Sequence, residues 1–320
     1  MPGGQRFSRR TFLYLGLGAT GIAGVALALP GRSTGMFPPP ERGASSAPPR
    51  FDAARTWQHL LAQVELGPRV PGTPAHEACR DYMETHLRRA LGASMLQPLV
   101  PDLGARHLRM WNVLAELAPE NPRKVLLAAH WDTRPYADQE REPARQGQPV
   151  PGANDGASGV AVLLEIATLI ADAPPPVGVR IVLFDGEDYG PDGDRMYLGS
   201  RHYAKHLPKP DPVWGAVLDM VGDRNLGIWR EQHSQSRAPQ VNDLVWRAAG
   251  SAGHGAVFHD GVRWSITDDH LPLLDAGLPV VDLIDFDYPY WHTVEDTVDK
   301  CSPQSLRAVG ETVLYALYAV

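Results

Sequence analysis

The sequence predicts an α/β protein: a mixed, mainly parallel central sheet covered on both faces by helices, as an α/β/α sandwich in a single domain. Several short segments are continuously apolar, as strands are when both faces of a sheet are covered. Segments with apolar residues at helical spacing alternate with these strands, which is the pattern of α/β folds. The 320 residues, 43% of them hydrophobic, are enough for a full-sized core.

The first half of the domain contains two predicted helices, two strands and a third helix. Segments 51–67 and 74–92 carry apolar residues at helical spacing, and each ends at a glycine, which favours helix termination. Residues 110–117 and 124–130 are apolar enough for strands, the second almost throughout. The next helical pattern covers residues 156–172.

The second half continues the alternation of strands and helices. Residues 136–151, before the third helix, form a polar, proline-containing run that we expect to be a long surface loop. After it, the patterns predict strands at 178–184, 212–220 and 279–285, and helices at 196–207, 238–253 and 302–320.

Residues 1–28 differ from the rest of the chain and resemble a twin-arginine export signal. The pair Arg9 and Arg10 precedes an apolar, Gly/Ala-rich stretch that ends in the small-residue pattern Ala-Leu-Ala. We therefore expect export by the twin-arginine route to the periplasm or the extracellular space. The alternative is an uncleaved segment that anchors the protein to the membrane.

Residues 29–50 form a Pro/Ser/Gly-rich linker with little to bury, so the folded domain is expected to span 51–320. Cys79 and Cys301 are the two cysteines. Export would permit a disulfide between them, but their positions in sequence leave the pairing open. Neither cysteine has the spacing of a zinc ligand.

The charge of the chain limits its expected partners. A net charge of -7 gives no reason to expect nucleic acid or an acidic membrane surface as a partner. We expect a monomer that contacts a membrane only through an uncleaved N-terminal segment.

The strand at 178–184 is followed by three acids within four positions, Asp185, Glu187 and Asp188. Carboxylates this close repel one another, and at the end of a buried strand they are also partly removed from water. The cluster therefore needs a source of positive charge.

Other segments also place histidine or carboxylate groups near the ends of predicted strands. Ligands of open α/β sheets bind beyond the carboxyl ends of the strands, so these groups are expected at the same edge of the sheet as the acidic cluster. Each has an ordinary alternative: Asp155 could cap a helix, Asp219 could bind a loop amide, and His130 could be a hydrogen-bonded core histidine. Together these alternatives require a coincidence of several segments at one edge. The residues are His130, Asp132, Asp155, Asp219 and His292.

Two histidines and several carboxylates suit a divalent metal ion, above all zinc. Such a cation would supply the missing positive charge. One acid of the cluster would bind the ion, and a neighbouring acid would remain free as a base. Residue spacing alone does not decide which of Glu187 and Asp188 has which role.

Six ordered motifs resemble the animal-type zinc-dependent glutaminyl-peptide cyclotransferases, including their bacterial branch, which are related to the zinc aminopeptidases. The resemblance begins near Leu66 and runs to the C-terminus, and it implies a zinc-aminopeptidase-like fold. The motifs are HWD, GANDGASG, FDGED, LDM, TDDH and YWHT.

The resemblance implies roles for individual residues. Asp155, Asp188 and His292 would hold one zinc ion, and Glu187 would be the general acid and base. The animal enzymes and most of the related aminopeptidases have glutamate where this chain has Asp188, so the shorter side chain changes the ligand geometry. The remaining implied site residues are Asp219 and Asp268 as acidic hydrogen-bonding partners, and Trp291, Thr267 and Tyr288 as substrate-binding residues.

The activity that the resemblance implies is conversion of an N-terminal glutamine, or glutamate, of peptides and proteins to pyroglutamate, with ammonia released from glutamine. The rival interpretation is an aminopeptidase with two zinc ions, in which His130 and Asp219 bind a second ion and Asp155 bridges the two. A third interpretation is an exported binding domain without catalysis. Glu187 argues against it, because a binding domain gains nothing from a free carboxylate beside a metal ion.

Overall fold

The computed structural model describes residues 47–101, 108–191 and 193–320. The expected export signal and most of the linker lie outside these described residues. Within them, no helix has the length and apolar character needed to cross a membrane.

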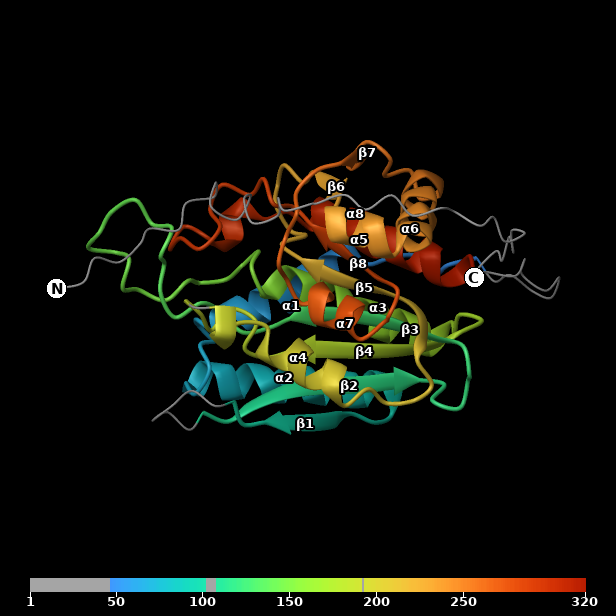
Figure 1. Cartoon of the computed structure of the whole chain (residues 1–320), viewed down its shortest axis with the longest axis horizontal. Helices are drawn as coiled ribbons and strands as arrows, with labels where there is room; N and C mark the ends of the chain where they lie inside the picture. The colour runs from blue at the N-terminus through green and yellow to red at the C-terminus, as the bar shows by residue number, and fades with distance from the viewer. Residues whose placement is uncertain (1–46, 102–107, 192) are drawn as a thin grey trace, which may run out of the picture.

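A six-stranded mixed sheet forms the centre of the fold, in the order β1-β2-β4-β3-β5-β8. Strands β4, β3, β5 and β8 pair in parallel, whereas β2 runs antiparallel to both β1 and β4. Figure 1 shows the strands one above another, from β1 to β8. The strands are Met95–Leu99 (β1), Met110–Leu117 (β2), Lys124–His130 (β3), Gly178–Phe184 (β4), Pro212–Asp219 (β5) and Val280–Ile284 (β8).

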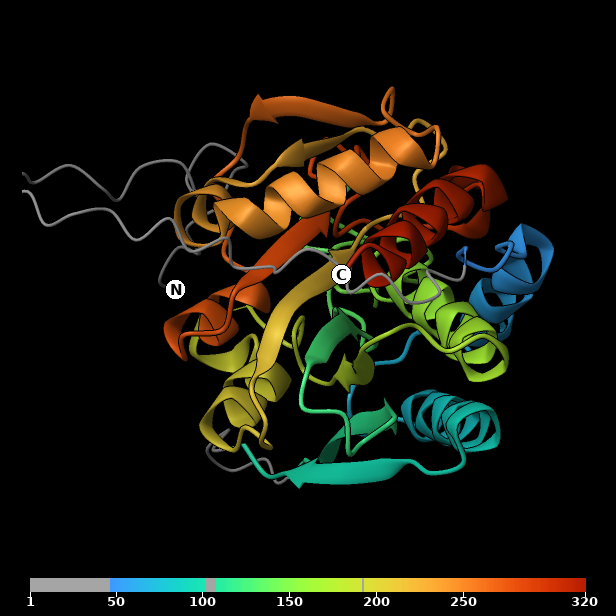
Figure 2. The same ribbon diagram turned by 90° about the vertical axis from the view of Figure 1, so that its right-hand side faces the viewer.

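Helices cover both faces of this sheet, which confirms the predicted mainly parallel α/β architecture. One layer contains α1 (Ala53–Glu65), α2 (Pro74–Leu91), α3 (Ala157–Asp172) and α8 (Pro303–Tyr318), which pack on one another and against the sheet. The opposite side carries α4 (Leu198–Lys205) and α7 (His270–Asp275), as Figure 2 shows.

Helix α3 is the central helix of the core. Most of its side chains are buried, in agreement with the nearly continuous apolar sequence. Gly159 permits its close approach to the sheet, because a Cβ atom at this position would lie 2.1 Å from the carbonyl oxygen of Leu218 in β5. The main hydrophobic cluster extends from Phe51 to Val320, so both ends of the expected domain contribute to it.

Several elements were not predicted from the sequence. Strand β1 lies at the sheet edge, and β6 (Ile228–Arg230) pairs with β7 (Phe258–Val262) in a separate small sheet. The helices α5 (Gln232–Arg237) and α7 are only six residues long, too short to show helical periodicity. Helix α6 (Pro239–Ser251) was predicted, as were the short helix α4 and the long C-terminal α8.

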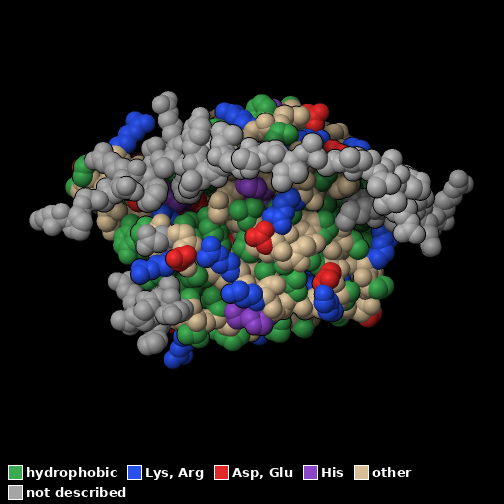
Figure 3. Space-filling model, in the orientation of Figure 1, with side chains coloured by type: hydrophobic (Ala, Val, Ile, Leu, Met, Phe, Trp, Pro, Cys, Tyr) green, Lys and Arg blue, Asp and Glu red, His purple; other side chains and the backbone are tan. Residues whose placement is uncertain are grey.

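The surface and the cysteines give two further results. On the face drawn in Figure 3, basic and acidic side chains are scattered among other residues rather than gathered in one patch.

Cys79 and Cys301 are both free and buried, so the disulfide that export would permit is not formed.

Candidate metal centre and pocket

The functional side chains lie where parallel strands end, as predicted. Strand β3 ends at His130, β5 ends at Asp219, and the acidic cluster directly follows β4. Asp155 precedes α3 but does not cap it, because the N-cap residue is Gly156 and no side chain caps this helix. Gly156 has a φ of 98°, and a Cβ atom there would lie 2.5 Å from the carbonyl oxygen of Asp132, so the turn requires glycine.

Asp155, Asp188 and His292 form one group whose potential ligand atoms all lie within 4.8 Å of one another. His292 Nε2 is 3.1 Å from Asp188 Oδ1 and 3.6 Å from Asp155 Oδ2. All three residues are buried. Asp155 Oδ2 and Asp188 Oδ2 are buried oxygens for which the described residues supply no hydrogen-bond donor. Two such oxygens beside an imidazole nitrogen fit a divalent cation.

His130, Asp155 and Asp219 form a second group of the same kind. His130 Nε2 lies 3.1 Å from Asp155 Oδ1 and 3.0 Å from Asp219 Oδ1. Asp155 therefore belongs to both groups and has one oxygen toward each. In this second group, the His130 Nε2 atom already contacts one oxygen of each aspartate.

Glu187 belongs to neither group. It lines a small cavity beside the two groups, called the inner pocket below, together with Asp155, Asp219 and Asp268. Burial, together with the charge of Asp188, raises the pKa of Glu187 well above its usual range. In the absence of a bound cation, this buried acid therefore favours its protonated form, whereas a cation beside it would favour the carboxylate.

Two buried aspartates hold the loops that carry these side chains. The carboxylate of Asp132 accepts hydrogen bonds from the backbone N–H groups of Glu187 at 3.0 Å and Asp188 at 3.1 Å. The carboxylate of Asp296 accepts from the N–H groups of Asn154 at 2.9 Å and Asp155 at 3.1 Å. Each of these buried carboxylates therefore fixes a loop that presents a candidate metal ligand.

Tyr288 does not have the substrate-binding position that the resemblance implied. It is completely buried, does not line the pocket, and donates a hydrogen bond through its hydroxyl to Asp296 at 2.7 Å. Tyr288 therefore supports the loop that carries Asp155. This position corrects the expectation that it contacts the substrate.

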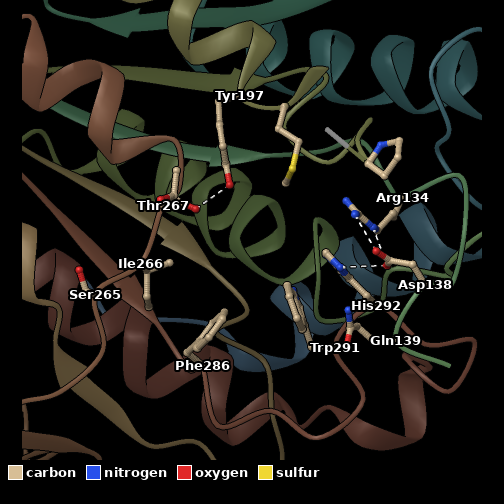
Figure 4. Close-up of a pocket in the computed structure, with 12 residues that line it drawn as sticks. Arg134, Asp138, Gln139, Tyr197, Ser265, Ile266, Thr267, Phe286, Trp291 and His292 are labelled. Carbon is tan, nitrogen blue, oxygen red and sulfur yellow. Dashed lines mark hydrogen bonds and ion pairs between the residues drawn. The ribbon is translucent and has the colours of Figure 1, made fainter. Parts of the chain in front are cut away.

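Arg134 and Asp138 connect two of the candidate ligands, and neither residue was predicted from the sequence. Arg134 Nη1 donates to Asp188 Oδ1 at 2.7 Å, while its Nε and Nη2 atoms donate to the two carboxylate oxygens of Asp138 at 2.8 and 2.9 Å. Asp138 Oδ1 lies 3.4 Å from His292 Nδ1, and Figure 4 shows the contacts of Asp138 with Arg134 and with His292. Part of the loop expected to be a polar surface segment therefore lies at the site.

A pocket with apolar walls opens beside the first group. The ring of Trp291 stacks on His292, with centroids 3.9 Å apart, and faces the interior together with Phe286. On the opposite side, the Tyr197 hydroxyl donates to the carbonyl oxygen of Thr267 at 2.7 Å. The walls near the candidate metal centre are Met196, Tyr197, Ile266, Thr267, Phe286 and Trp291.

Some of the site has unusual backbone geometry. His292 has a φ of 55°, and Met220, which follows Asp219 and lines the inner pocket, has a φ of 47°. Residues other than glycine rarely adopt this left-handed region, and they do so where surrounding structure or function requires it.

Comparisons with known proteins extend over most of the chain. Residues 112–317 match Peptidase family M28. Aminopeptidase YwaD of Bacillus subtilis is 29% identical over 65% of this chain, which covers only 44% of that relative. A glutaminyl-peptide cyclotransferase of Drosophila melanogaster is 29% identical over 78% of each chain.

Solved structures of both descriptions resemble this fold. A Tannerella forsythia glutaminyl cyclase is 38% identical, with a TM-score of 0.82, and the match covers 85% of this chain and 100% of that one. A chain described as a leucine aminopeptidase precursor from Bacteroides thetaiotaomicron is 36% identical, with a TM-score of 0.82, over 86% of this chain and 99% of that one.

Asp138→Ala is expected to weaken zinc binding by about 10–100-fold, the usual effect of removing a group that orients a metal ligand. The substitution removes the carboxylate beside His292 and frees Arg134, which then no longer holds Asp188 in one position. Affinity is measured on the purified chain by competition with a chelator.

Glu142→Ala is the matched control, because Glu142 is an exposed acid in the same loop. Its affinity for zinc should equal that of the wild type. An unchanged affinity in Asp138→Ala would show that His292 and Asp188 are oriented by other contacts.

Proposed function

The chain belongs to peptidase family M28, and we infer that within this family it is a glutaminyl-peptide cyclotransferase of the bacterial type. It converts the N-terminal glutamine of a peptide or protein to pyroglutamate and releases ammonia. The likeness to the Tannerella forsythia glutaminyl cyclase, which includes the whole of that chain, is the observation that carries this conclusion. The Drosophila melanogaster cyclotransferase supports it at the level of sequence.

The family and the donor groups support zinc as the cofactor. We propose one ion, held by Asp155, Asp188 and His292. Each of the two aspartates has a buried oxygen without a donor, which supports this choice, whereas in the other group His130 Nε2 already contacts one oxygen of each aspartate. When bound, zinc supplies Lewis-acid polarisation of the carbonyl group of the glutamine side chain.

The residues of the chain would carry the proton transfer. The α-amine nitrogen of the substrate forms a bond to its own side-chain carbonyl carbon, and the bond from that carbon to the amide nitrogen breaks. Glu187 is placed to accept one proton from the amine and to return it to the leaving nitrogen, which departs as ammonia. Asp268 and Asp219 line the same inner pocket, where they would bind the N–H groups of the substrate.

The pocket walls would favour the folded substrate. Both reacting groups belong to one residue, so much of the catalytic gain comes from holding the side chain back against its own amine. The flat ring of Trp291 beside His292 supplies an apolar surface for that shape. Such a surface also limits the access of water, which would otherwise convert the amide to a carboxylate.

The second candidate function is an aminopeptidase with two zinc ions. It is supported by the group formed by His130, Asp155 and Asp219, and by the likeness to the chain described as a leucine aminopeptidase precursor. In this alternative, Glu187 would activate a water molecule instead of transferring a proton between two substrate nitrogens.

Measurement of bound metal together with two substrates separates these functions. We expect about one zinc ion per active chain, ammonia release from peptides with N-terminal glutamine, and no comparable hydrolysis of leucyl-anilide. Two zinc ions per chain together with anilide hydrolysis would establish the aminopeptidase instead.

Glu187→Gln should lower the turnover of glutamine peptides by ~10²–10⁴-fold, because the amide keeps the size of the side chain but cannot transfer the proton. Zinc content should be unchanged, since Glu187 belongs to neither group of potential ligands. Asp188→Asn is the matched variant and should lose zinc. The opposite pattern, in which Glu187→Gln loses the metal and Asp188→Asn retains it, would reverse the two roles.

We also propose that the enzyme is exported by the twin-arginine route, on the basis of Arg9 and Arg10 before an apolar segment. This route carries folded proteins, which suits a domain that assembles its metal site before transport. Replacing both arginines by lysine should leave the enzyme in the cytoplasm, as measured by cell fractionation. Undiminished export would exclude the route.

A further inference from the structure

Behind the inner pocket lies a buried cluster of ionisable side chains, of which the proposed reaction uses only Asp268 directly. Its members come from four places in the chain: the N-cap of α5, the turn before α7, the start of α7, and the middle of β8. All are at most 3% exposed. The cluster consists of Glu231, Asp268, Asp269, His270 and Asp282.

Glu231 is well suited to carry its negative charge. It accepts hydrogen bonds from the backbone N–H groups of His233, Ser234 and Ile266 and from the Ser234 hydroxyl, at distances of 2.7–3.2 Å. His270 Nε2 lies 3.2 Å from Glu231 Oε2. Although burial acts in the opposite direction, contacts with His270 and the backbone lower the pKa of Glu231 to about 2.

Asp282 has the opposite surroundings. Among the described residues, no N–H or O–H group donates a hydrogen bond to either of its carboxyl oxygens. The groups that face it are the acids Asp268, Asp219 and Glu231, and His270, whose Nδ1 atom lies 3.4 Å from Asp282 Oδ2. A buried carboxylate without donors and among three other acids is strongly disfavoured.

Asp268 provides the complementary acceptor. Its Oδ1 atom accepts from the backbone N–H of Asp269, while Oδ2 is buried and without a donor. The ligand-type atoms of Asp268, His270 and Asp282 lie within 4.8 Å of one another. One hydrogen atom between Asp282 and Asp268 would satisfy an oxygen on each residue. Burial and its acidic neighbours raise the pKa of Asp282 well above its usual range, in agreement with this arrangement.

We propose that Asp282 remains a neutral carboxylic acid at neutral pH, donates a hydrogen bond to Asp268 and thereby fixes the orientation of Asp268 in the pocket. Glu231 holds His270, and His270 limits the movement of Asp282, whose backbone N–H donates to Ser234 Oγ at 3.0 Å. Asp282 is thus a positioning residue. Its effect on turnover rests on the proposed function, but its state of protonation does not.

The dependence of stability on pH tests the protonation directly. The ordinary pKa of an aspartate is about 3.9, so above that pH the unfolded chain has lost the proton that the folded chain keeps on Asp282. Folding must then take up a proton, and wild-type stability falls as the pH rises until the folded group also titrates. An asparagine at this position donates the same hydrogen bond without requiring a proton.

Asp282→Asn should therefore have a higher Tm than the wild type, and the difference should grow between pH 5 and pH 8. The control Asp211→Asn replaces a half-exposed aspartate paired with Lys209 and should give no difference that grows with pH. A Tm of Asp282→Asn below that of the wild type throughout this range, or a difference that shrinks as the pH rises, would overturn the proposal.

Turnover of glutamine peptides tests the positioning role. Asp282→Asn should retain kcat within about tenfold of the wild type. Asp282→Ala, which loses the donor, should fall about 10–100-fold below Asp282→Asn with the same zinc content, because a buried oxygen of Asp268 is then left without a hydrogen-bond donor. Equal losses in both variants would overturn the positioning role. If Asp282→Ala does not fold, the Tm and the turnover of Asp282→Asn decide alone. If the wild type releases no ammonia, the comparison of Tm values still decides the protonation of Asp282.

Discussion

The arrangement of this enzyme depends on how it accommodates many carboxyl groups out of water at one edge of a sheet. Three physical solutions occur side by side. Asp132 and Asp296 receive backbone N–H groups and in return fix the loops around them. Asp155 and Asp188 have oxygens that suit a cation, with Arg134 supporting the second of them. Farther from the pocket, acids such as Asp282 are best satisfied by a proton.

The fold makes this concentration of acids possible because it holds them on rigid elements. Strands β3, β4 and β5 are buried along nearly their whole length, and their register places His130, the acidic cluster and Asp219 at neighbouring strand ends. Helix α3 fixes the loop of Asp155 from behind, with Gly159 in close contact with β5. Little rearrangement is then needed when the substrate enters, which favours electrostatic catalysis.

The strands, the longer helices and the edge that carries the site could be predicted because apolar runs and helical spacing are local signals. The acids after β4 were recognised for the same reason, since they directly follow a strand. Arg134 and Asp138 were missed because their importance arises from contacts with Asp188 and His292, more than 50 and 150 positions away in sequence. The substrate-binding role of Tyr288 was taken from the resemblance, which did not reveal that its hydroxyl donates a hydrogen bond to Asp296.

The stacking of Trp291 on His292 has a consequence for the evolution of substrate range. One wall of the pocket is the immediate neighbour of a candidate metal ligand, so a change in the shape of this wall also disturbs the ligand. Ile266 and Phe286 form other parts of the wall, and neither is adjacent in sequence to Asp155, Asp188 or His292. Natural variation that adapts relatives to different peptides should therefore accumulate on the side of Ile266 and Phe286, while the tryptophan–histidine pair is inherited as a unit.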